Sequence, residues 1–420
     1  MKFVLASCGT RGDVEPCAAV GLELRRRGHD VVMATPPDQV SFVEGMGLTA
    51  VPMGPPTGEI PDVFVTPWTI KDPIKPLRDA MDHINERWAD VSNTLKSVTA
   101  GADLLFTGVS YQEAAANVAE HYGIPVAAWH HVPMRPNGQV VSLVPAPLLR
   151  VAMRLTDWAQ WRLVKRAEDT QRDGLGIPRA HAPASRRMAE RGSLEMQAYD
   201  ALCFPGVQRE WTAQRPFVGA LTAELPTDFD DETLTWIASG TPPIYFGFGS
   251  MPVKSPAEMV RMIIASCDEL GERALICSGA THLADIPDSP RVKVVRAVSH
   301  AAVFPACRAV VHHGGAGTTA AGLRAGVPTL ILWVASDQPI WASVVKRLKV
   351  GRARRFSRTT GKSLTKDLRR ILTPQYAQRA REVAAQMTKA TESVATAADL
   401  LESAAGGKRR SGCGGSMYGG

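Results

Sequence analysis

Short apolar runs alternate with longer stretches of helical periodicity along the chain. Residues 2–7 are rich in Phe, Val and Leu and lead into a glycine loop at residues 9–12. Residues 17–24 carry apolar side chains at helical spacing, and residues 31–34 form the next apolar run. A strand, a helix and a second strand in this order form a βαβ unit, which predicts a parallel sheet covered by helices.

The same pattern occurs in both halves of the chain. Residues 103–107, 111–122 and 125–129 predict a strand, a helix and a strand, and the polar, proline-containing residues 216–231 suit a linker. We therefore expect an α/β protein with two doubly wound, Rossmann-like domains that face one another across a cleft. In the second cycle, strands are expected at residues 243–246, 273–278, 292–295, 309–311 and 329–332, and a helix at residues 257–270.

Two further segments stand out between these elements. Residues 52–76 hold many prolines and predict a long surface loop, whereas residues 147–165 have a helical pattern with Trp158 and Trp161 among arginines. These tryptophans are typical of a helix core, and they would also suit an apolar acceptor site. The expected organisation is a first domain at residues 1–218, a second at 219–377, a polar, alanine-rich helix at 378–404 that crosses back to the first domain, and a disordered, glycine-rich tail at 405–420.

Composition favours two globular domains and a cytoplasmic protein. The chain has 420 residues, 45% of them hydrophobic and 21% charged, so it is too long for one ordinary core and unlike a disordered chain. No run of about 18 uncharged apolar residues predicts a membrane span, and the start lacks a signal-peptide pattern. The seven cysteines are scattered without a CxxC pair, which favours a reducing compartment and indicates neither a disulfide framework nor a zinc site.

An excess of basic residues raises the question of an anionic partner. The formal net charge is +7, and much of the excess lies in residues 346–370, where the Lys and Arg side chains face few acids. Such a run is typical of a solvated face, but it also suits peripheral contact with anionic headgroups at the inner membrane. Nucleic acid is not expected as a partner, because no aromatic residues interleave the run as stacking platforms.

The motif that points most directly to chemistry is Val-Val-His-His-Gly-Gly-Ala-Gly-Thr-Thr at residues 310–319. It lies between an apolar strand and a helix, so its small residues would let a diphosphate approach free backbone N–H groups at the helix start. His312 would donate to a phosphate oxygen, and Thr318 would add a hydroxyl. The motif is neither a Walker loop nor a Rossmann GxGxxG, and a tight turn with a satisfied histidine explains it equally well.

Two other loops of the second half should lie beside this motif. Gly247-Phe248-Gly249-Ser250 and Asp337-Gln338-Pro339 each follow a predicted strand, and parallel sheets bind ligands at the carboxyl ends of their strands. Asp337 and Gln338 offer carboxylate and amide oxygens to the hydroxyls of a sugar. Asp337 also fits a helix N-cap, with Pro339 in the first turn.

The first half offers one candidate base and two histidines at the ends of its predicted strands. Asp13 fits a cap of the helix that follows, and it would also suit a base that accepts a proton from an acceptor hydroxyl. His130 and His131 follow residues 125–129, and because adjacent histidines point in different directions, at most one should reach an acceptor. Thr10 and Arg11 complete the candidates for an acceptor site.

These motifs together resemble a known family. Gly-Thr-Arg-Gly-Asp-Val-Glu-Pro at residues 9–16, Arg-Arg-Gly-His-Asp-Val at 26–31 and Phe-Gly-Ser at 248–250 precede the 310–319 motif and Asp-Gln-Pro at 337–339. In this order they resemble the bacterial branch of glycosyltransferase family 1, which includes glycopeptide-antibiotic, sterol and actinobacterial glycopeptidolipid glycosyltransferases. The resemblance covers nearly the whole chain apart from the tail.

The resemblance implies a GT-B fold with the acceptor domain first and the nucleotide-sugar donor domain second. It implies a hexosyltransferase that inverts the anomeric carbon without a metal or another cofactor. Asp13 would be the catalytic base, Asp337 and Gln338 would hold the donor sugar, and Val298 would lie near the nucleobase. The residues that would bind the donor diphosphate are Ser250, His312, Gly315, Ala316, Gly317 and Thr318.

The substrates stay open at this point. The donor is expected to be a UDP- or dTDP-sugar, carrying a deoxyhexose such as rhamnose or 6-deoxytalose, or glucose. The expected acceptor is hydrophobic, with a glycopeptidolipid or other lipid ahead of a sterol or polyketide. A nucleotide-sugar epimerase and a non-catalytic helper protein share this architecture. The presence of Asp13, His312 and Asp337 favours the transferase.

Overall fold

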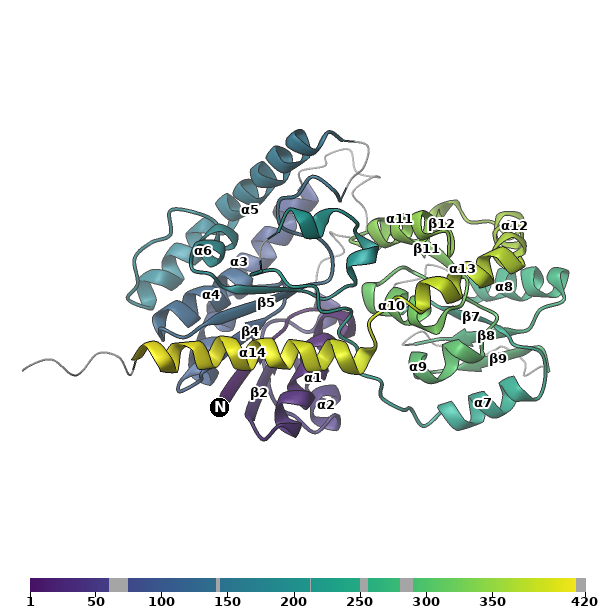
Figure 1. Cartoon of the computed structure of the whole chain (residues 1–420), viewed down its shortest axis with the longest axis horizontal. Helices are drawn as coiled ribbons and strands as arrows, with labels where there is room; N and C mark the ends of the chain where they lie inside the picture. Colours follow the sequence, from purple (N-terminus) through teal and green to yellow (C-terminus); the bar gives the residue numbers. More distant parts are fainter. Residues whose placement is uncertain (60–74, 141–143, 212, 250–255, 280–289, 413–420) are drawn as a thin grey trace, which may run out of the picture. The chain divides into compact units, whose positions relative to one another are not determined.

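A computed structural model gives the fold of residues 1–59, 75–140, 144–211, 213–249, 256–279 and 290–412. The chain divides into two compact units. Unit 1 comprises Met1–Ala223 with Ala390–Gly420, and unit 2 comprises Glu224–Lys389. Each unit is a parallel β-sheet with helices on its faces (Figure 1). The boundary therefore falls at residues 223 and 224, whereas the sequence predicts it at 218 and 219.

Unit 1 contains strands that alternate with helices, because parallel neighbours need a crossover connection. Its strands are β1 (Lys2–Ala6), β2 (Asp30–Thr35), β3 (Thr49–Pro52), β4 (Leu104–Thr107), β5 (Val126–His130) and β6 (Leu194–Gln197). Its main helices are α1 (Arg11–Arg26), α2 (Val40–Gly45), α3 (Lys75–Thr99), α4 (Gln112–His121), α5 (Ala146–Gly174), α6 (Ala184–Glu190) and α14 (Ala390–Gly412). The strand order in the sheet is β3-β2-β1-β4-β5-β6.

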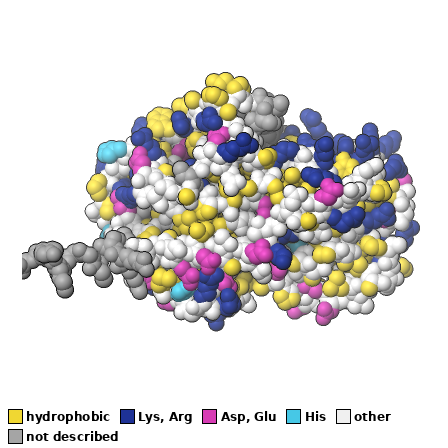
Figure 2. Space-filling view, viewed as in Figure 1, with side chains coloured by type: hydrophobic (Ala, Val, Ile, Leu, Met, Phe, Trp, Pro, Cys, Tyr) yellow, Lys and Arg dark blue, Asp and Glu magenta, His cyan; other side chains and the backbone are white. Residues whose placement is uncertain are grey.

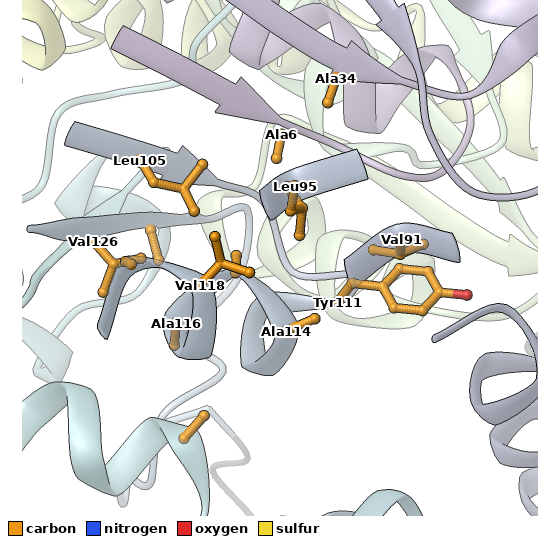
Figure 3. Close-up of a cluster of buried hydrophobic side chains, with 14 of the residues drawn as sticks. Ala6, Ala34, Val91, Leu95, Leu105, Tyr111, Ala114, Ala116, Val118 and Val126 are labelled. Carbon is orange, nitrogen blue, oxygen red and sulfur yellow. The ribbon is translucent and has the colours of Figure 1, made fainter. Parts of the chain in front are cut away.

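The two faces of this sheet bury different cores, because successive side chains of a strand point to opposite faces. On one face, Ala6 and Leu105 meet Leu95 of α3 and Val118 of α4, as Figure 3 shows. On the other face, alternate strand residues such as Leu5 pack with α1 and α14. The apolar runs of the sequence are continuous because both faces of each strand are covered.

The end of the chain differs from the single helix expected at residues 378–404. It forms α13 (Pro374–Ala384) in unit 2 and then α14, which packs on unit 1 through Ala398 and Leu401. Arg27, which follows the last residue of α1, binds Glu402 of α14 at 2.7 Å. The helix α14 continues to Gly412, beyond residue 405, where disorder was expected to begin, and residues 413–420 lie outside the described part of the chain.

Unit 2 repeats the architecture of unit 1. Its strands are β7 (Ile244–Gly247), β8 (Ala274–Cys277), β9 (Val292–Val295), β10 (Ala309–His312), β11 (Thr329–Trp333) and β12 (Gly351–Arg355). Its helices besides α13 are α7 (Asp230–Ala238), α8 (Pro256–Leu270), α9 (His300–Val303), α10 (Ala316–Ala325), α11 (Gln338–Leu348) and α12 (Gly361–Ile371). The order β12-β11-β10-β7-β8-β9 is that of unit 1 read from the opposite edge.

This strand order indicates where a ligand site is expected in each unit. In unit 1 the chain winds outward in opposite directions from β1 and β4, and in unit 2 it does so from β7 and β10. Doubly wound sheets bind ligands at this point, outside the carboxyl ends of the two central strands. Within the described residues, none of the helices combines the length and apolar character needed to cross a membrane.

Candidate active site

Three loops of unit 2 come together at the carboxyl edge of its sheet. Strand β10 lies between β7 and β11, so the loops that follow these three strands are neighbours. A Cβ built on Gly249, after β7, would lie 3.0 Å from Cε1 of His313, after β10. A Cβ built on Gly314 would lie 3.4 Å from Cβ of Gln338, at the start of α11. The sequence-predicted loops therefore form one cluster, although Ser250 lies outside the described residues.

Glycines allow this cluster to close tightly. Gly314 has a φ of +98°, which L side chains rarely adopt, and a Cβ there would be 2.7 Å from Cγ2 of Ile331. Gly315 is the N-cap of α10, and a Cβ on it would be 2.6 Å from Nε2 of His313. The first residues of α10 follow at once, and the N–H groups of the first turn of a helix have no partner within the helix.

His312 is a buried hydrogen-bond donor beside this helix start. Its side chain is 0% exposed, and Nδ1 accepts a hydrogen bond of 3.0 Å from the backbone N–H of Gly314. Burial holds the pKa of His312 well below its ordinary value, so the ring is neutral and carries its proton on Nε2. Within the described part of the chain, Nε2 has no hydrogen-bond partner. A buried N–H without a partner is rare and suits a ligand acceptor.

His313 is a site residue that the sequence reasoning missed. Its ring lies between the two glycine loops, against Gly249 and Gly315. Burial lowers the pKa of His313, and the negative charge of Asp337 acts in the opposite direction. The side chains of His313 and Asp337 are therefore close enough to interact. No local pattern predicts this contact, because it depends on loops that are far apart in the sequence.

The loop after β11 carries the two candidate sugar ligands. Asp337 occupies the N-cap position of α11, but its side chain makes no capping hydrogen bond, contrary to the simple cap interpretation. Oε1 of Gln338 accepts hydrogen bonds from the backbone N–H groups of Val334 and Ala335, at 2.7 and 3.3 Å. These contacts fix the orientation of the Gln338 amide and direct its oxygen to its own loop.

The structure places Val298 in the core rather than on the site surface. It follows β9 at the same edge of the sheet, but its side chain is buried with Val295 and Val303. Its neighbour Ser299 donates its backbone N–H to Oδ1 of Asp230 at 2.8 Å. Any contact of Val298 with a nucleobase would therefore involve its backbone.

Asp13 is held in place at the end of β1 in unit 1. It is the third residue of α1, and its Oδ2 accepts hydrogen bonds from the backbone N–H of Thr10 at 2.8 Å and from the Thr10 hydroxyl at 3.1 Å. Gly9 has a φ of +141°, and a Cβ there would lie 2.3 Å from the same carboxylate oxygen. Asp13 is thus part of a capping box. This arrangement also fixes its carboxylate near the carboxyl end of β1, from which the chain winds outward.

The other candidates of unit 1 differ in their access to solvent. His130 is 1% exposed, and its ring nitrogens lie 3.4 Å from the amide of Gln112 and 3.5 Å from that of Gln197. Burial lowers its pKa well below the ordinary value. His131 is half-buried, with its ring 6.0 Å from that of Trp129, so it is the more accessible of the pair.

Arg11 is oriented along the surface of α1. Its Nε donates to Glu15 at 3.2 Å, and its guanidinium lies 4.4 Å from the centre of the Phe42 ring. Thr10, which binds Asp13, is exposed. Of the two tryptophans of α5, Trp161 is buried and donates to Glu168, whereas Trp158 is exposed.

Known proteins match this chain along nearly its whole length. Residues 3–127 match the glycosyltransferase family 28 N-terminal domain, and residues 262–402 match the C-terminal domain of the erythromycin biosynthesis protein CIII-like family. An uncharacterized glycosyltransferase of Mycobacterium tuberculosis is 62% identical over 410 residues, covering 96% of this chain and 99% of that protein. The vancomycin aglycone glucosyltransferase of Amycolatopsis orientalis is 32% identical, covering 96% of this chain and 97% of that protein.

Solved structures with low sequence identity share the fold. The glycosyltransferase VinC, solved in complex with dTDP, superposes with a TM-score of 0.67 at 17% identity, covering 97% of this chain and 100% of that one. Both six-stranded parallel sheets thus belong to a GT-B architecture. The chain belongs to the family of bacterial GT-B glycosyltransferases that includes the vancomycin aglycone glucosyltransferase, and it is a glycosyltransferase.

Proposed function

We propose that this glycosyltransferase transfers a sugar from a UDP- or dTDP-sugar to a hydroxyl of a hydrophobic acceptor, with inversion at the anomeric carbon. The observation that carries the proposal is the buried Nε2–H of His312 beside the N-terminus of α10. A neutral donor next to free backbone N–H groups suits an anion such as a diphosphate.

The donor diphosphate would lie against the first turn of α10. The backbone N–H groups of Ala316, Gly317 and Thr318 would bind its oxygens, and His312 would donate from Nε2. These groups would stabilise the negative charge that develops on the diphosphate as the sugar departs. A preorganised donor of this kind contributes roughly 3 kcal/mol to catalysis. Asp337 and Gln338 would hold the hydroxyls of the donor sugar.

Asp13 would act as the base in unit 1. Its two contacts with Thr10 restrict the carboxylate to one orientation, which is what a positioned base requires. It would remove the proton of the acceptor hydroxyl as the oxygen attacks the anomeric carbon, a contribution of about 10²- to 10⁴-fold in rate. Thr10 and His131 are proposed to make polar contacts with the acceptor.

The substrate classes follow from chemistry and from relatives. VinC was solved with dTDP, which supports a nucleoside diphosphate as the leaving group here. The named relative acts on the vancomycin aglycone, which supports a large secondary metabolite or lipid as acceptor. Among these we favour a lipid-linked acceptor such as a glycopeptidolipid, with a deoxyhexose or glucose as the transferred sugar. The reaction is proposed to need no metal, because His312 and the helix start would supply the charge stabilisation.

A thermal-shift titration with UDP, dTDP and GDP, with and without EDTA, tests the donor site. A nucleotide present at 100 times its dissociation constant should raise the unfolding free energy by about 2.7 kcal/mol. We expect UDP or dTDP to stabilise the protein equally with and without EDTA, and His312→Ala to abolish most of this effect. His130→Ala, another buried histidine but in unit 1, is the matched control and should keep the nucleotide response.

The other outcomes distinguish the alternatives. Stabilisation lost on adding EDTA would contradict metal independence, and an unchanged response in His312→Ala would contradict the proposed diphosphate contact. Absence of any response at millimolar nucleotide would favour a non-catalytic protein. Nucleotide binding with isomerisation of the donor sugar, in the absence of any acceptor, would favour an epimerase.

A further inference from the structure

The helix α5 exposes a continuous apolar stripe. Leu148, Val151, Leu155 and Trp158 recur at helical spacing along one face, and their side chains are between 51% and 63% exposed. The opposite face of α5 is buried in unit 1 through residues such as Trp161. In Figure 2, hydrophobic side chains gather along the upper edge of unit 1, where Figure 1 draws α5, with basic side chains among them. A stripe of this length, about 15 Å, is unusual on a solvent-exposed helix.

A basic hollow continues the stripe toward the C-terminal part of α5. Arg162 and Arg166 follow on the same face of the helix and are exposed, and they have no ion-pair partner among the residues that the structure describes. The guanidinium of Arg162 lies 5.6 Å from the centre of the Trp158 ring, so the apolar and basic parts are contiguous. The hollow has a volume of about 450 Å³ and is lined by Arg162, Lys165, Arg166, Asp169, Thr170 and Arg179.

We propose that this face of α5 docks unit 1 onto an anionic lipid surface. The apolar stripe would enter the boundary between headgroups and acyl chains, where tryptophan is favoured. Arg162 and Arg166 would bind lipid phosphates at the basic hollow, since each basic residue near an anionic bilayer adds attraction. The docking surface is defined by Leu148, Val151, Leu155, Trp158, Arg162 and Arg166, and it does not depend on the identity of donor or acceptor.

The pattern of charge favours a membrane over a second copy of the chain. Two copies of α5 packed antiparallel along the whole surface from Leu148 to Arg166 would place the apolar end of one helix on the basic end of the other. Two copies packed parallel would bring Arg162 and Arg166 against the same residues of the partner. The first arrangement places cations against apolar side chains, and the second brings like charges together, so both are unfavourable. An anionic bilayer satisfies both parts of the surface at once.

The basic run at residues 346–370 is a weaker choice for the same role. The structure places the buried carboxylate of Asp367 between Arg352 and Arg354, at 2.9 and 2.7 Å, and Arg369 pairs with Glu269. Part of its charge is therefore neutralised within unit 2. It offers no comparable exposed apolar stripe among the described residues.

Flotation of the full chain with vesicles tests the proposal. The probes are vesicles of phosphatidylcholine alone and vesicles of phosphatidylcholine with phosphatidylglycerol in equal parts. We expect binding to the mixed vesicles only. Arg162→Gln with Arg166→Gln should weaken it about thirtyfold, because each charge contributes about 1 kcal/mol near an anionic surface. Leu155→Ser with Trp158→Ser should weaken it by a similar factor, and all these residues are exposed, so the variants should fold.

Matched controls lie in unit 2. Lys366→Gln with Arg370→Gln removes the same charge from the exposed face of α12, and Phe229→Ser removes an exposed apolar side chain. Both controls should bind like the natural chain. Equal loss in the Lys366 and Arg370 variant would overturn the assignment to α5 and favour the basic run. Absence of binding by the natural chain would overturn the proposal, as would concentration-dependent dimers that Trp158→Ser abolishes.

Vesicles with brominated acyl chains give a second readout. Bromine quenches tryptophan fluorescence at short range, so part of the emission should be quenched when the protein binds. Trp158→Phe keeps an apolar ring and should bind equally well, but it should lose most of this quenching. Equal quenching in the natural chain and in Trp158→Phe would show that another surface enters the lipid, and would contradict the proposal.

Discussion

Asp13 combines two roles in one side chain, and a single substitution separates them. Asp13→Asn keeps an oxygen that can accept the Thr10 hydrogen bonds, so α1 should stay capped and the fold intact. It removes the proton acceptor, so we expect transfer to fall by about 10²-fold or more while nucleotide binding is unchanged. The check is a transfer assay beside calorimetry with UDP or dTDP. Normal turnover by the variant would exclude Asp13 as the base.

A substitution at Gly315 tests how closely His313 approaches the start of α10. A Cβ on Gly315 would lie 2.6 Å from Nε2 of His313, so Gly315→Ala must displace that ring or the helix start. We expect the affinity for nucleoside diphosphate to fall at least tenfold, with only a small change in the thermal midpoint. Gly361→Ala, at the start of α12 in the same unit, is the control, because a Cβ there would lie no closer than 3.9 Å to another side chain. Calorimetric affinities that are equal in both variants would contradict the contact.

The site was only partly predictable at the level of single residues. His312 and the glycines after it form a local strand–loop–helix pattern, so the sequence alone indicates them. His313 and its contact with Gly249 depend on β7 and β10 being neighbours, and no local pattern reports that pairing. Val298 shows the converse case. The resemblance implies that it lies near the nucleobase, but its side chain is buried in the core.

At the scale of elements, α14 supplies part of the core of unit 1. Leu401 is 0% exposed, so Leu401→Ala should lower the free energy of unfolding of unit 1 by about 3 kcal/mol. Nucleotide affinity should not change, because the proposed donor site lies in unit 2. Urea unfolding followed with and without dTDP measures both quantities. Ser403→Ala, on the exposed side of the same helix, should be close to neutral.

Buried strands with continuous apolar runs were predictable, and polar edge strands were not. The strands β1, β4, β5, β7, β10 and β11 follow from runs that must be covered on both faces. The edge strand β12 has the sequence Gly-Arg-Ala-Arg-Arg, and only its pairing with β11 and the ion pairs of Asp367 make it a strand. The break between α13 and α14 was missed because residues 378–404 keep helical propensity throughout.

For the whole molecule, three histidines with lowered pKa values predict a stability that depends on pH. Burial lowers the pKa of His130, His312 and His313 in the folded chain, relative to an ordinary value of 6.5. Below that value the unfolded chain takes up protons that the folded chain does not. Stability should therefore be greatest above about pH 6.5 and fall as the pH is lowered, by up to about 1.4 kcal/mol per pH unit for each histidine.

Thermal midpoints measured from about pH 8 to about pH 5 check this expectation. Carboxylates with lowered pKa values, such as Glu23, lose their contribution below this window, as the pH falls from the ordinary pKa of 4.5 to the folded-state value of about 2. His130→Gln should reduce the slope in this window, whereas replacing the exposed histidine His181 should not. A flat profile down to about pH 5 would mean that these rings gain protons in the folded chain.

Unit 2 is one uninterrupted stretch of chain, whereas unit 1 is assembled from two segments that flank it in the sequence. During synthesis, a nascent chain that has just passed residue 389 has all of unit 2 but lacks Ala397, Ala398, Leu401 and Ala405 of unit 1. The usual order, in which the N-terminal domain finishes folding first, is therefore reversed. Until α14 has left the ribosome, the apolar face that it covers stays open to solvent. A chain that stops before α14 should therefore have a complete unit 2 and an incompletely folded unit 1.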